Sequence, residues 1–495
     1  MKQDSLIVTL TFGAYFILVL AIGWYAYRRT ASLSDFILGG RSLGSGTAAL
    51  SASASDMSGW LLLGLPGFAY VAGLESLWLA GGLLLGTWIN WRLLAARLRV
   101  FSEVYGDALT LPEFFANRFR DESGWLRGVS AFFILLFFLL YTGSGLVAGG
   151  KLFESVFGLP YVWAVAAGAS AILLYTVVGG FLAVSWTDVL QGLLMAAALV
   201  AVPALAFSAV GGLEPASERI EAINPHLLNP FTGEDGSTIG LIGILSLAAW
   251  GLGYFGQPHI LARFQAIRSA SDVGRARLIA VSWVAVTLSA AVLVGLAGIL
   301  VLETPLTSDD REKVFIELVN LLFHPVIAGI CLAAILAAIM STADSQLLVS
   351  SSTFTEDFYR TVLRREAGPR ELVAVGRGAV AAIAGLAFLI ALDPNTLVLD
   401  LVGYAWAGFG AAFGPVLILA LYWRRMTKRG ALAGVLTGGI TVVVWKQLDG
   451  GLFDLYEIVP GFLFALCAVW TASVTDPAPR ADLEEEFMRA LDYRE

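Results

Sequence analysis

Apolar stretches long enough to cross a membrane recur along almost the whole chain, and they restrict its possible folds more than any other feature. Residues 279–302, for example, contain no charged side chain. A hydrocarbon core about 30 Å thick is crossed by roughly 20 apolar residues in a helix. Only 14% of the 495 residues are charged, whereas soluble proteins carry about 25%. The sequence therefore predicts an all-α membrane protein, because a helix satisfies its own backbone hydrogen bonds inside lipid.

About thirteen such stretches are expected to be transmembrane helices. An odd number places the two termini on opposite sides of the membrane. Most of the 31 lysines and arginines then fall on the same side as the C-terminus, and positively charged loops favour the cytoplasm. We therefore expect the N-terminus outside and the C-terminus in the cytoplasm. The expected spans are residues 6–27, 45–72, 76–98, 126–153, 160–178, 187–210, 240–258, 279–302, 325–356, 372–392, 397–423, 430–447 and 456–475.

Composition argues against several functional classes. The net charge of −8 comes largely from loops and the acidic tail, so it indicates no nucleic-acid partner. The two cysteines, Cys331 and Cys467, lie in apolar segments, which argues against a disulfide framework or a cysteine metal site. The three histidines are scattered, and no Ser/His or His/Glu constellation indicates an intramembrane enzyme. The tail at 476–495 is too short for a signalling kinase, which argues against a membrane sensor.

The second expected span contains a polar interruption. Asp56 lies in the stretch LSASASDMSGW, residues 50–60, inside an otherwise apolar segment. An ionisable group at membrane depth costs about 2.5–3.5 kcal/mol on insertion scales, and it usually meets an ion, a proton or a substrate. The serines and the glycine also weaken the helix around it. A broken helix that offers oxygen ligands beside a carboxylate is typical of a transporter.

The seventh expected span contains a second interruption, AWGLGYFGQPHI at residues 249–260. Gly251, Gly253 and Gly256 match the dinucleotide pattern G-x-G-x-x-G, but that function requires a preceding strand and a βαβ unit. The two interrupted helices are five helices apart, so a five-helix repeat would be inverted in its second copy. Such repeats place a binding site between their broken helices. Two unrelated glycine-rich packing helices are the alternative.

A hydroxyl-bearing face on the ninth span suits a sodium ion. Ser341 and Thr342 lie in the middle of this span and share a face with residues 338 and 345. Hard cations bind several oxygen ligands, and carbonyls freed near Ala54 and Met57 would add to these hydroxyls. Asp56 either completes this field or caps the second half of its own helix. Alternatively, the hydroxyls simply bond to carbonyls one turn earlier.

Aromatic residues near both breaks suit a small zwitterion. Trp250 and Tyr254 lie one turn apart, Pro258 follows them, and Tyr141 lies in the fourth span. Free N–H groups at a helix N-terminus would bind the carboxylate of such a ligand. Tryptophan and tyrosine in membrane spans also serve as interfacial anchors or packing residues, and that interpretation is equally open.

The chain resembles the solute:sodium symporter family from its N-terminal region to about residue 475. The matching strings are ILGGRSLG (37–44), LSASASDMSGWLLLGLPG (50–67), GGFLAVSWTD (179–188), WGLGYFGQPHILARF (250–264), ILAAIMST (335–342) and YAWAGFGAAFGP (404–415). The resemblance implies a LeuT-like core of two inverted five-helix repeats with two broken helices, formed by the second to eleventh spans. The implied division is a first helix with its inner loop, a first repeat, an outer loop, a second repeat, two further helices and a cytoplasmic tail, at residues 1–44, 45–210, 211–239, 240–423, 424–475 and 476–495.

The resemblance also implies roles for particular residues. The implied sodium ligands are Ala54, Met57, Ala338, Ser341 and Thr342, with Asp56 important for sodium binding. The implied substrate site contains Ser58, Gly59, Tyr141, Trp250, Tyr254 and Pro258.

Two further features follow from the family pattern. Arg41 is expected to act in inner gating. Some members bind a second sodium near an aspartate, here Asp188, with hydroxyls near Ser341 and Ser345. Asp344 departs from the pattern, since relatives carry a small hydroxyl residue there. This carboxylate would strengthen a second cation site or bind a proton.

The resemblance implies import of L-proline coupled to sodium ions across the bacterial cytoplasmic membrane. The expected partners are proline, sodium and the lipid bilayer. The alternative is a sodium symporter for another small solute, such as pantothenate, a sugar or a carboxylate. No P-loop is evident in the sequence, which favours an ion gradient as the energy source.

Overall fold

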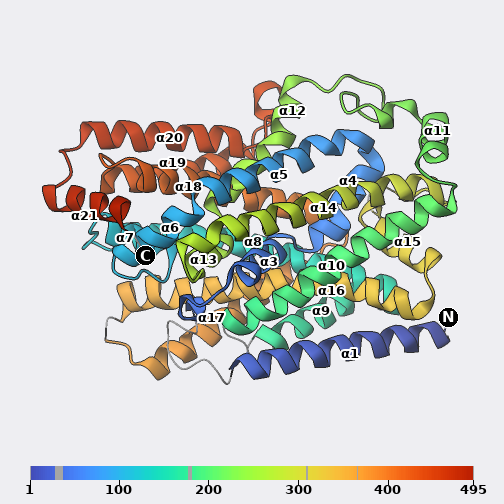
Figure 1. The fold of residues 1–495 in the computed structure, drawn as a ribbon, viewed down its shortest axis with the longest axis horizontal. Coiled ribbons are helices and arrows are strands. Elements are labelled where there is room, and N and C mark those ends of the chain that lie inside the picture. The colour runs from blue at the N-terminus through green and yellow to red at the C-terminus, as the bar shows by residue number, and fades with distance from the viewer. Residues whose placement is uncertain (1, 28–36, 177–180, 308–309, 365, 494–495) are drawn as a thin grey trace.

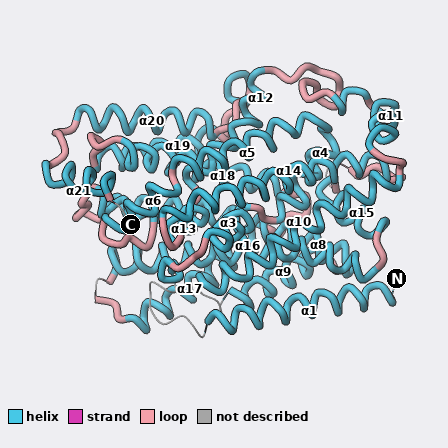
Figure 2. The backbone as a smooth tube through the Cα atoms, viewed as in Figure 1, coloured by secondary structure: helices cyan, strands magenta, loops and turns pink. Residues whose placement is uncertain are grey.

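A computed structural model describes residues 2–27, 37–176, 181–307, 310–364 and 366–493. These residues form packed helices and no β-strand, which confirms the all-α prediction (Figures 1 and 2). The principal helices are α1 (Lys2–Tyr27), α3 (Ser45–Asp56), α4 (Leu65–Ala72), α5 (Ser76–Leu93), α6 (Ala95–Val104), α7 (Leu111–Arg118), α8 (Trp125–Phe157), α9 (Tyr161–Thr176), α10 (Phe181–Ala209), α11 (Leu213–Ile223), α12 (Leu241–Ala248), α13 (Pro258–Ala266), α14 (Val273–Val301), α15 (Val314–Leu322), α16 (Pro325–Ser352), α17 (Pro369–Ile390), α18 (Val398–Tyr422), α19 (Lys428–Trp445), α20 (Ile458–Thr475) and α21 (Ala481–Asp492).

Membrane-length helices dominate the described part of the chain. Nine helices there are long and apolar enough to cross a membrane, and shorter apolar helices lie at Tyr161–Leu173 and Leu241–Gly256. This agrees with a multi-pass membrane protein, while the count of thirteen spans stays a prediction. The expected end of the fifth span at residue 178, and the first two glycines of the string at 179–188, lie outside the described residues.

Two helices are interrupted where the sequence predicts it. In the first, α3 ends at Asp56 and a wide turn, Trp60–Gly64, leads into α4. In the second, a tightly wound segment, Ala249–Gly256, separates α12 from α13. Proline is the first residue of α13, a position where its missing N–H costs no hydrogen bond.

The two interrupted helices run in opposite directions. The backbone N–H of Leu43, just before α3, donates to the carbonyl of Ala266 at the end of α13 (3.1 Å). The N–H of Arg268 donates back to the carbonyl of Leu43 (2.9 Å). The start of the first interrupted helix therefore lies beside the end of the second, as an inverted pair requires (Figure 1).

The same pattern of helix contacts occurs twice in the core, once for each repeat. Helix α3 packs on α10, and its counterpart Ala249–Gly256 packs on α18. Helix α4 packs on α14, while Ala249–Gly256 packs on α5. In the same way α16 packs on α10 and α8 packs on α18. Each of these contacts made by a helix of one five-helix unit thus has an equivalent contact in the other unit. This repeated packing is the LeuT-like arrangement.

The two chain ends lie at opposite ends of the bundle's long axis (Figure 1). Helices α11 and α15 lie toward the end that carries the N-terminus. Helices α6, α7 and α21 lie at the other end, which we call the C-terminal end of the bundle. Which side of the membrane each end faces stays a prediction.

Candidate functional site

The first break exposes a backbone carbonyl that the surrounding side chains hold in place. Asp56 ends α3, and its carbonyl accepts hydrogen bonds from the N–H of Ser58, the indole Nε1 of Trp60 and the hydroxyl of Tyr141, each at 3.1 Å. Gly59 allows α8 to approach, because a Cβ there would lie 2.6 Å from the Cβ of Ala148. The break is therefore a built feature, fixed by groups from two helices.

The predicted sodium ligands meet across α3 and α16. The hydroxyls of Ser341 and Thr342 donate to the carbonyl of Ala54, at 2.8 and 3.5 Å. The Ser341 hydroxyl also reaches the carbonyl of Ala338 at 3.1 Å. All four residues are buried, and Met57 is fully buried beside them. Each hydroxyl oxygen keeps lone pairs for a cation, so this cluster offers neutral oxygens of the kind that hard cations bind.

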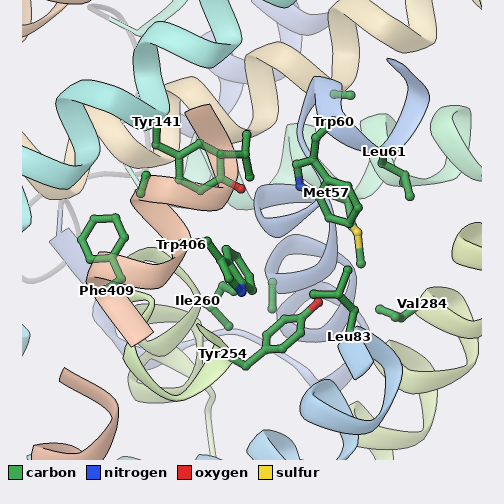
Figure 3. Close-up of a cluster of buried hydrophobic side chains, with 14 of the residues drawn as sticks. Met57, Trp60, Leu61, Leu83, Tyr141, Tyr254, Ile260, Val284, Trp406 and Phe409 are labelled. Atoms are coloured by element: carbon green, nitrogen blue, oxygen red, sulfur yellow. The ribbon is translucent and has the colours of Figure 1, made fainter. Parts of the chain in front are cut away.

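Asp56 links the two breaks. Its Oδ2 accepts a hydrogen bond from the Tyr254 hydroxyl at 2.6 Å, whereas its Oδ1 has no partner among the described residues. The side chain makes no capping bond to the second half of its own helix, so the capping alternative is not observed. The carboxylate thus faces the second interrupted helix, and Figure 3 shows Tyr141 and Tyr254 directed toward the segment that carries Met57 and Trp60.

Aromatic residues from the segment Ala249–Gly256, from α18 and from the turn before α20 lie around the second break. Tyr254 meets Trp406 edge to face, with ring centroids 5.0 Å apart. The Trp406 Nε1 donates to the carbonyl of Trp250 at 2.6 Å, and the Trp250 ring stacks on Tyr456 at 5.5 Å. Only glycine fits at Gly253, since a Cβ there would lie 1.8 Å from Trp406 Nε1.

The predicted substrate residues divide into two groups. Ser58, Gly59, Tyr141 and Tyr254 surround the Asp56 carbonyl and carboxylate, while Trp250 is joined to them through Trp406. Pro258 lies further along, on a cavity of about 20 Å³ that Ala262 and Gln265 also line. That volume holds roughly one water molecule. Ser58, Tyr141, Trp250 and Tyr254 are at most 8% exposed, and Gly59 and Pro258 are buried, so the site is closed in this conformation.

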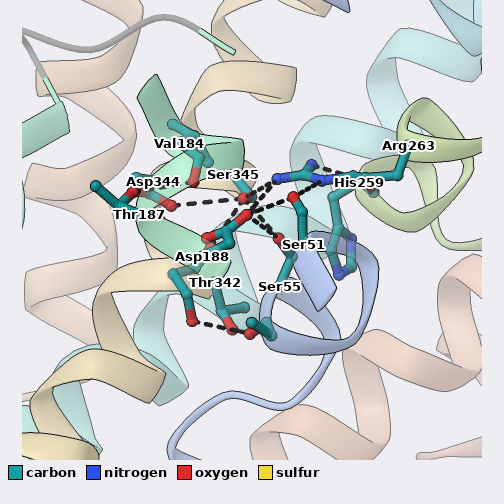
Figure 4. A network of polar contacts seen from close by, with 12 residues as sticks. Ser51, Ser55, Val184, Thr187, Asp188, His259, Arg263, Thr342, Asp344 and Ser345 are labelled. Atoms are coloured by element: carbon teal, nitrogen blue, oxygen red, sulfur yellow. Dashed lines mark hydrogen bonds and ion pairs between the residues drawn. The ribbon is translucent and has the colours of Figure 1, made fainter. Parts of the chain in front are cut away.

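A second polar cluster lies where a second ion is predicted, and the guanidinium group of Arg263 enters it from one side (Figure 4). Asp188 Oδ2 accepts hydrogen bonds from Ser51 (2.6 Å) and Ser55 (3.1 Å), and Arg263 Nη2 lies 3.2 Å away. The same nitrogen of Arg263 donates to the Ser345 hydroxyl at 2.6 Å. The structure therefore brings Asp188 and Ser345 together, but around an arginine.

Asp344 contributes a second carboxylate to this cluster. Its Oδ1 lies 3.5 Å from the Ser345 hydroxyl, while its Oδ2 and the Oδ1 of Asp188 have no partner among the described residues. Asp188, Arg263 and Asp344 are all fully buried. Two carboxylates with one arginine leave unbalanced negative charge if both are ionised, and burial makes such a charge costly unless a cation or proton joins it.

Arg41 ties together three segments at the C-terminal end of the bundle. It donates from Nε to Asp107 (2.7 Å) and from Nη1 to Ser102 (3.1 Å) and the Gln265 carbonyl (2.7 Å). A further bond reaches the carbonyl of Ala108 at 3.1 Å. The arginine thus connects the segment before α3 to α6 and α13, and its gating role stays a prediction.

Sequence reasoning missed three site residues: Trp60, Trp406 and Arg263. Each lies in a string that carries the family resemblance, so each could have been found there. Arg263 also carried a direct signal, because it is a charged residue close to a predicted membrane break.

Comparison with known proteins agrees with this geometry. Residues 36–438 match the model of the "Sodium:solute symporter family". The chain is 50% identical over 485 residues to the "Sodium/proline symporter" of Salmonella typhimurium, covering 97% of this chain and 95% of the relative. It is 49% identical over 479 residues to the "Osmoregulated proline transporter OpuE" of Bacillus subtilis, covering 96% of each.

A solved structure shares the fold. It is described as the substrate-bound, outward-open state of a sodium-coupled sialic acid symporter, and it aligns with a TM-score of 0.76 over 96% of this chain and 99% of the other, at 20% identity. At that identity the likeness shows the fold alone. The family match, by contrast, covers most of the chain and includes the broken helices, the hydroxyl face of α16 and Arg41. The chain belongs to the sodium:solute symporter family.

Proposed function

We propose that this protein imports L-proline together with sodium ions by alternating access. The observation that carries the proposal is the junction of two opposed broken helices through Asp56 and Tyr254, beside the hydroxyls that converge on the Ala54 carbonyl. Relatives about half identical over nearly the full length are described as sodium/proline symporters, which supports proline over other solutes. Transport, and no catalytic step, is the proposed activity.

In this proposal sodium binds between α3 and α16. The carbonyls of Ala54 and Ala338 and the hydroxyl oxygens of Ser341 and Thr342 are the ligands, with the Met57 carbonyl completing the set. The hydroxyl protons rotate away from the Ala54 carbonyl when the ion arrives. Asp56 lies one helical position before Met57, so its negative charge favours the cation without direct contact.

Proline binds next to the ion, between the two breaks. Its carboxylate meets the N–H of Gly59 after the first break, and that of Ser58 once Ser58 gives up its bond to the Asp56 carbonyl, because helix N-termini attract anions. Its pyrrolidine ring packs against Tyr141, Tyr254 and Trp250, with Pro258 at the far side of the pocket. The pocket opens for proline in a state other than the closed one described above.

Sodium binding and proline binding are coupled because both sites include residues of the first break. The first break carries the proposed sodium ligands of α3 on one side and Ser58 and Gly59 on the other. A sodium ion that orders this break prepares the proline site, and by linkage proline raises the affinity for sodium by the same factor. The sodium gradient thereby drives proline uptake.

The same proposal includes orientation and domains. Apolar helices and bacterial relatives support a multi-pass protein of a bacterial membrane. We place the N-terminus outside and the C-terminal end of the bundle in the cytoplasm, with repeats at 45–210 and 240–423 and the outer loop at 211–239. We assign residues 1–44 to the first helix and inner loop, of which residues 1 and 28–36 lie outside the described part of the chain. Residues 424–475 are assigned to two C-terminal helices and 476–495 to the tail.

A second ion site around Asp188, Asp344 and Ser345 is part of this proposal. The two carboxylate oxygens without partners, together with the Ser345 hydroxyl, are its ligands. Arg263 shares Asp188 with any cation that binds there, so the arginine and the ion would compete for that carboxylate.

Labelled proline uptake into proteoliposomes tests the proposed function. Uptake should exceed the background several-fold with an inward sodium gradient and fall to background when potassium replaces sodium. Competition by excess pantothenate, glucose or acetate measures the alternative cargo. Sodium-dependent proline uptake that one of these solutes abolishes, or no sodium dependence at all, would contradict the proposal.

A further inference from the structure

The C-terminal helix α21 is docked against the rest of the protein at the C-terminal end of the bundle. Arg120, after α7, forms ion pairs with Asp482 and Glu486 on α21. These groups are partly exposed, so the ion pairs contribute little energy by themselves. They fix the position of α21 along its axis relative to the end of α7. A second set of contacts lies beneath the helix.

Phe487 is the apolar anchor of this contact. Its side chain is only 3% exposed although it lies on a short helix of an acidic tail. Its ring meets Phe101 of α6 edge to face, with centroids 5.3 Å apart, and the guanidinium of Arg118 lies 4.9 Å from its centroid. Ala490, one turn later, is also 3% exposed. Aromatic side chains dominate the energetics of packed interfaces, so Phe487 is the main apolar contact that holds α21.

The end of the tail reaches the same helix. The Tyr493 hydroxyl donates to Glu103 of α6 at 3.1 Å. Glu103 in turn pairs with Arg99, one turn earlier on α6. The Arg99 guanidinium donates to the carbonyls of Ile267 (2.7 Å) and Arg268 (3.2 Å), just after α13. A continuous set of bonds thus runs from the tail to the end of the second interrupted helix.

Helix α6 also holds the start of the first interrupted helix. Ser102 accepts a hydrogen bond from Arg41, which precedes α3 and also bonds to the Gln265 carbonyl of α13. Leu43 and Ile267 form the backbone bridge between the two interrupted helices at this end. α6 therefore braces both interrupted helices where they meet, and α21 packs on α6 from outside.

We propose that α21 is a latch that keeps the C-terminal end of the bundle closed. Opening of that end requires α3 and α13 to separate from each other and from α6. A docked α21 fixes α6 through Phe101 and Glu103 and so favours the closed arrangement, and its release lowers the cost of opening. The inference that this end is the exit for proline rests on the proposed function, whereas the latch itself rests on the contacts of α21.

A cysteine accessibility measurement tests the latch. Cys331 and Cys467 are replaced by alanine, and Ala262→Cys is introduced on α13, where it lines the small closed cavity. In lipid nanodiscs, where a water-soluble maleimide reaches both faces, Phe487→Ala should raise the labelling rate at position 262 by about fivefold, the effect of about 1 kcal/mol. Met488→Ala, which changes an exposed neighbour on the same helix, is the matched control and should leave the rate unchanged.

Arg120→Ala is the second variant, since it removes the ion pairs without touching the apolar anchor. It should also raise the labelling rate at position 262, but by a smaller factor than Phe487→Ala. Equal labelling rates in Phe487→Ala, Arg120→Ala and Met488→Ala would overturn the latch. Sodium-driven proline uptake by Met488→Ala is measured in parallel, so that a failure of the proposed transport function is seen separately from the labelling result.

Discussion

At the scale of single residues, the contact between Asp56 and Tyr254 is the most informative. The two residues lie 198 positions apart in the sequence, yet their side chains are 2.6 Å apart at the meeting of the two breaks. Sequence patterns indicated that each was important, because one is a carboxylate and the other an aromatic residue in an interrupted span. Their contact could not be predicted, since nothing local determines which side chains two distant breaks bring together.

Tyr254→Phe should weaken sodium activation of proline uptake by about tenfold. The substitution keeps the aromatic ring but removes the hydrogen bond that the buried Asp56 carboxylate accepts from Tyr254, a loss of about 1–3 kcal/mol. The measurement is the sodium concentration that gives half-maximal uptake. Tyr422→Phe is the matched control, because the Tyr422 hydroxyl bonds to the Leu93 carbonyl at the exposed surface, far from the breaks in the sequence. An unchanged sodium requirement in Tyr254→Phe would remove Asp56 from the ion site.

Gly253→Ala should abolish transport and lower the yield of folded protein. Its Cβ would lie 1.8 Å from Trp406 Nε1, which must move and give up its bond to the Trp250 carbonyl. Gly240→Ala is the control, because a Cβ at that position meets nothing within 4 Å. Thermal unfolding and proline binding of the two purified variants make the comparison. Equal melting temperatures with unchanged binding would show that Trp406 is not fixed as described.

At the scale of helices, the sequence patterns located the two interrupted helices and the hydroxyl-bearing face, but not most of the side-chain contacts between helices. Both interrupted helices were predictable, because serine, glycine and proline at membrane depth weaken a helix and leave polar groups for a ligand. The arginine in the Asp188 cluster was not, since the pair of Arg263 and Asp188 joins residues 75 positions apart. Helix α21 was also missed. Its acidic surface resembles a solvated tail, and only the structure shows that Phe487 is buried against α6.

Docking of α21 should be insensitive to pH between about 8 and 5. Desolvation acts to raise the pKa of Asp482. The hydrogen bond and charge of Arg120 outweigh it and hold this pKa below its usual value. A carboxylate with a lowered pKa stabilises the docked state above its unfolded pKa of about 3.9, and that contribution is lost only as the pH falls through the lower, docked value. A spin label at Met488→Cys reports the mobility of α21. Mobility that rises between pH 7 and 5 would contradict this charge arrangement.

At the scale of the whole molecule, an inverted pair of five-helix units explains why a site forms at the centre. Each unit supplies one broken helix, and the two run in opposite directions with their ends bridged at Leu43 and Ile267. The odd number of helices per unit made the inversion predictable from the sequence. The closed state of the pocket was not, because it depends on how far α3, α13 and α6 lie apart, a property of packing between distant segments.

The claim on which everything else depends is that sodium binds between the first break and the hydroxyl face of α16. It is tested most directly by the effect of sodium on labelled proline binding to the purified protein and to two variants at position 342. Thr342→Ser keeps the hydroxyl, and its proline affinity should rise with sodium as in the unaltered protein. Thr342→Val keeps the shape without the oxygen, and sodium should no longer raise its affinity for proline. Full sodium stimulation of proline binding in Thr342→Val would contradict the assignment of the sodium site.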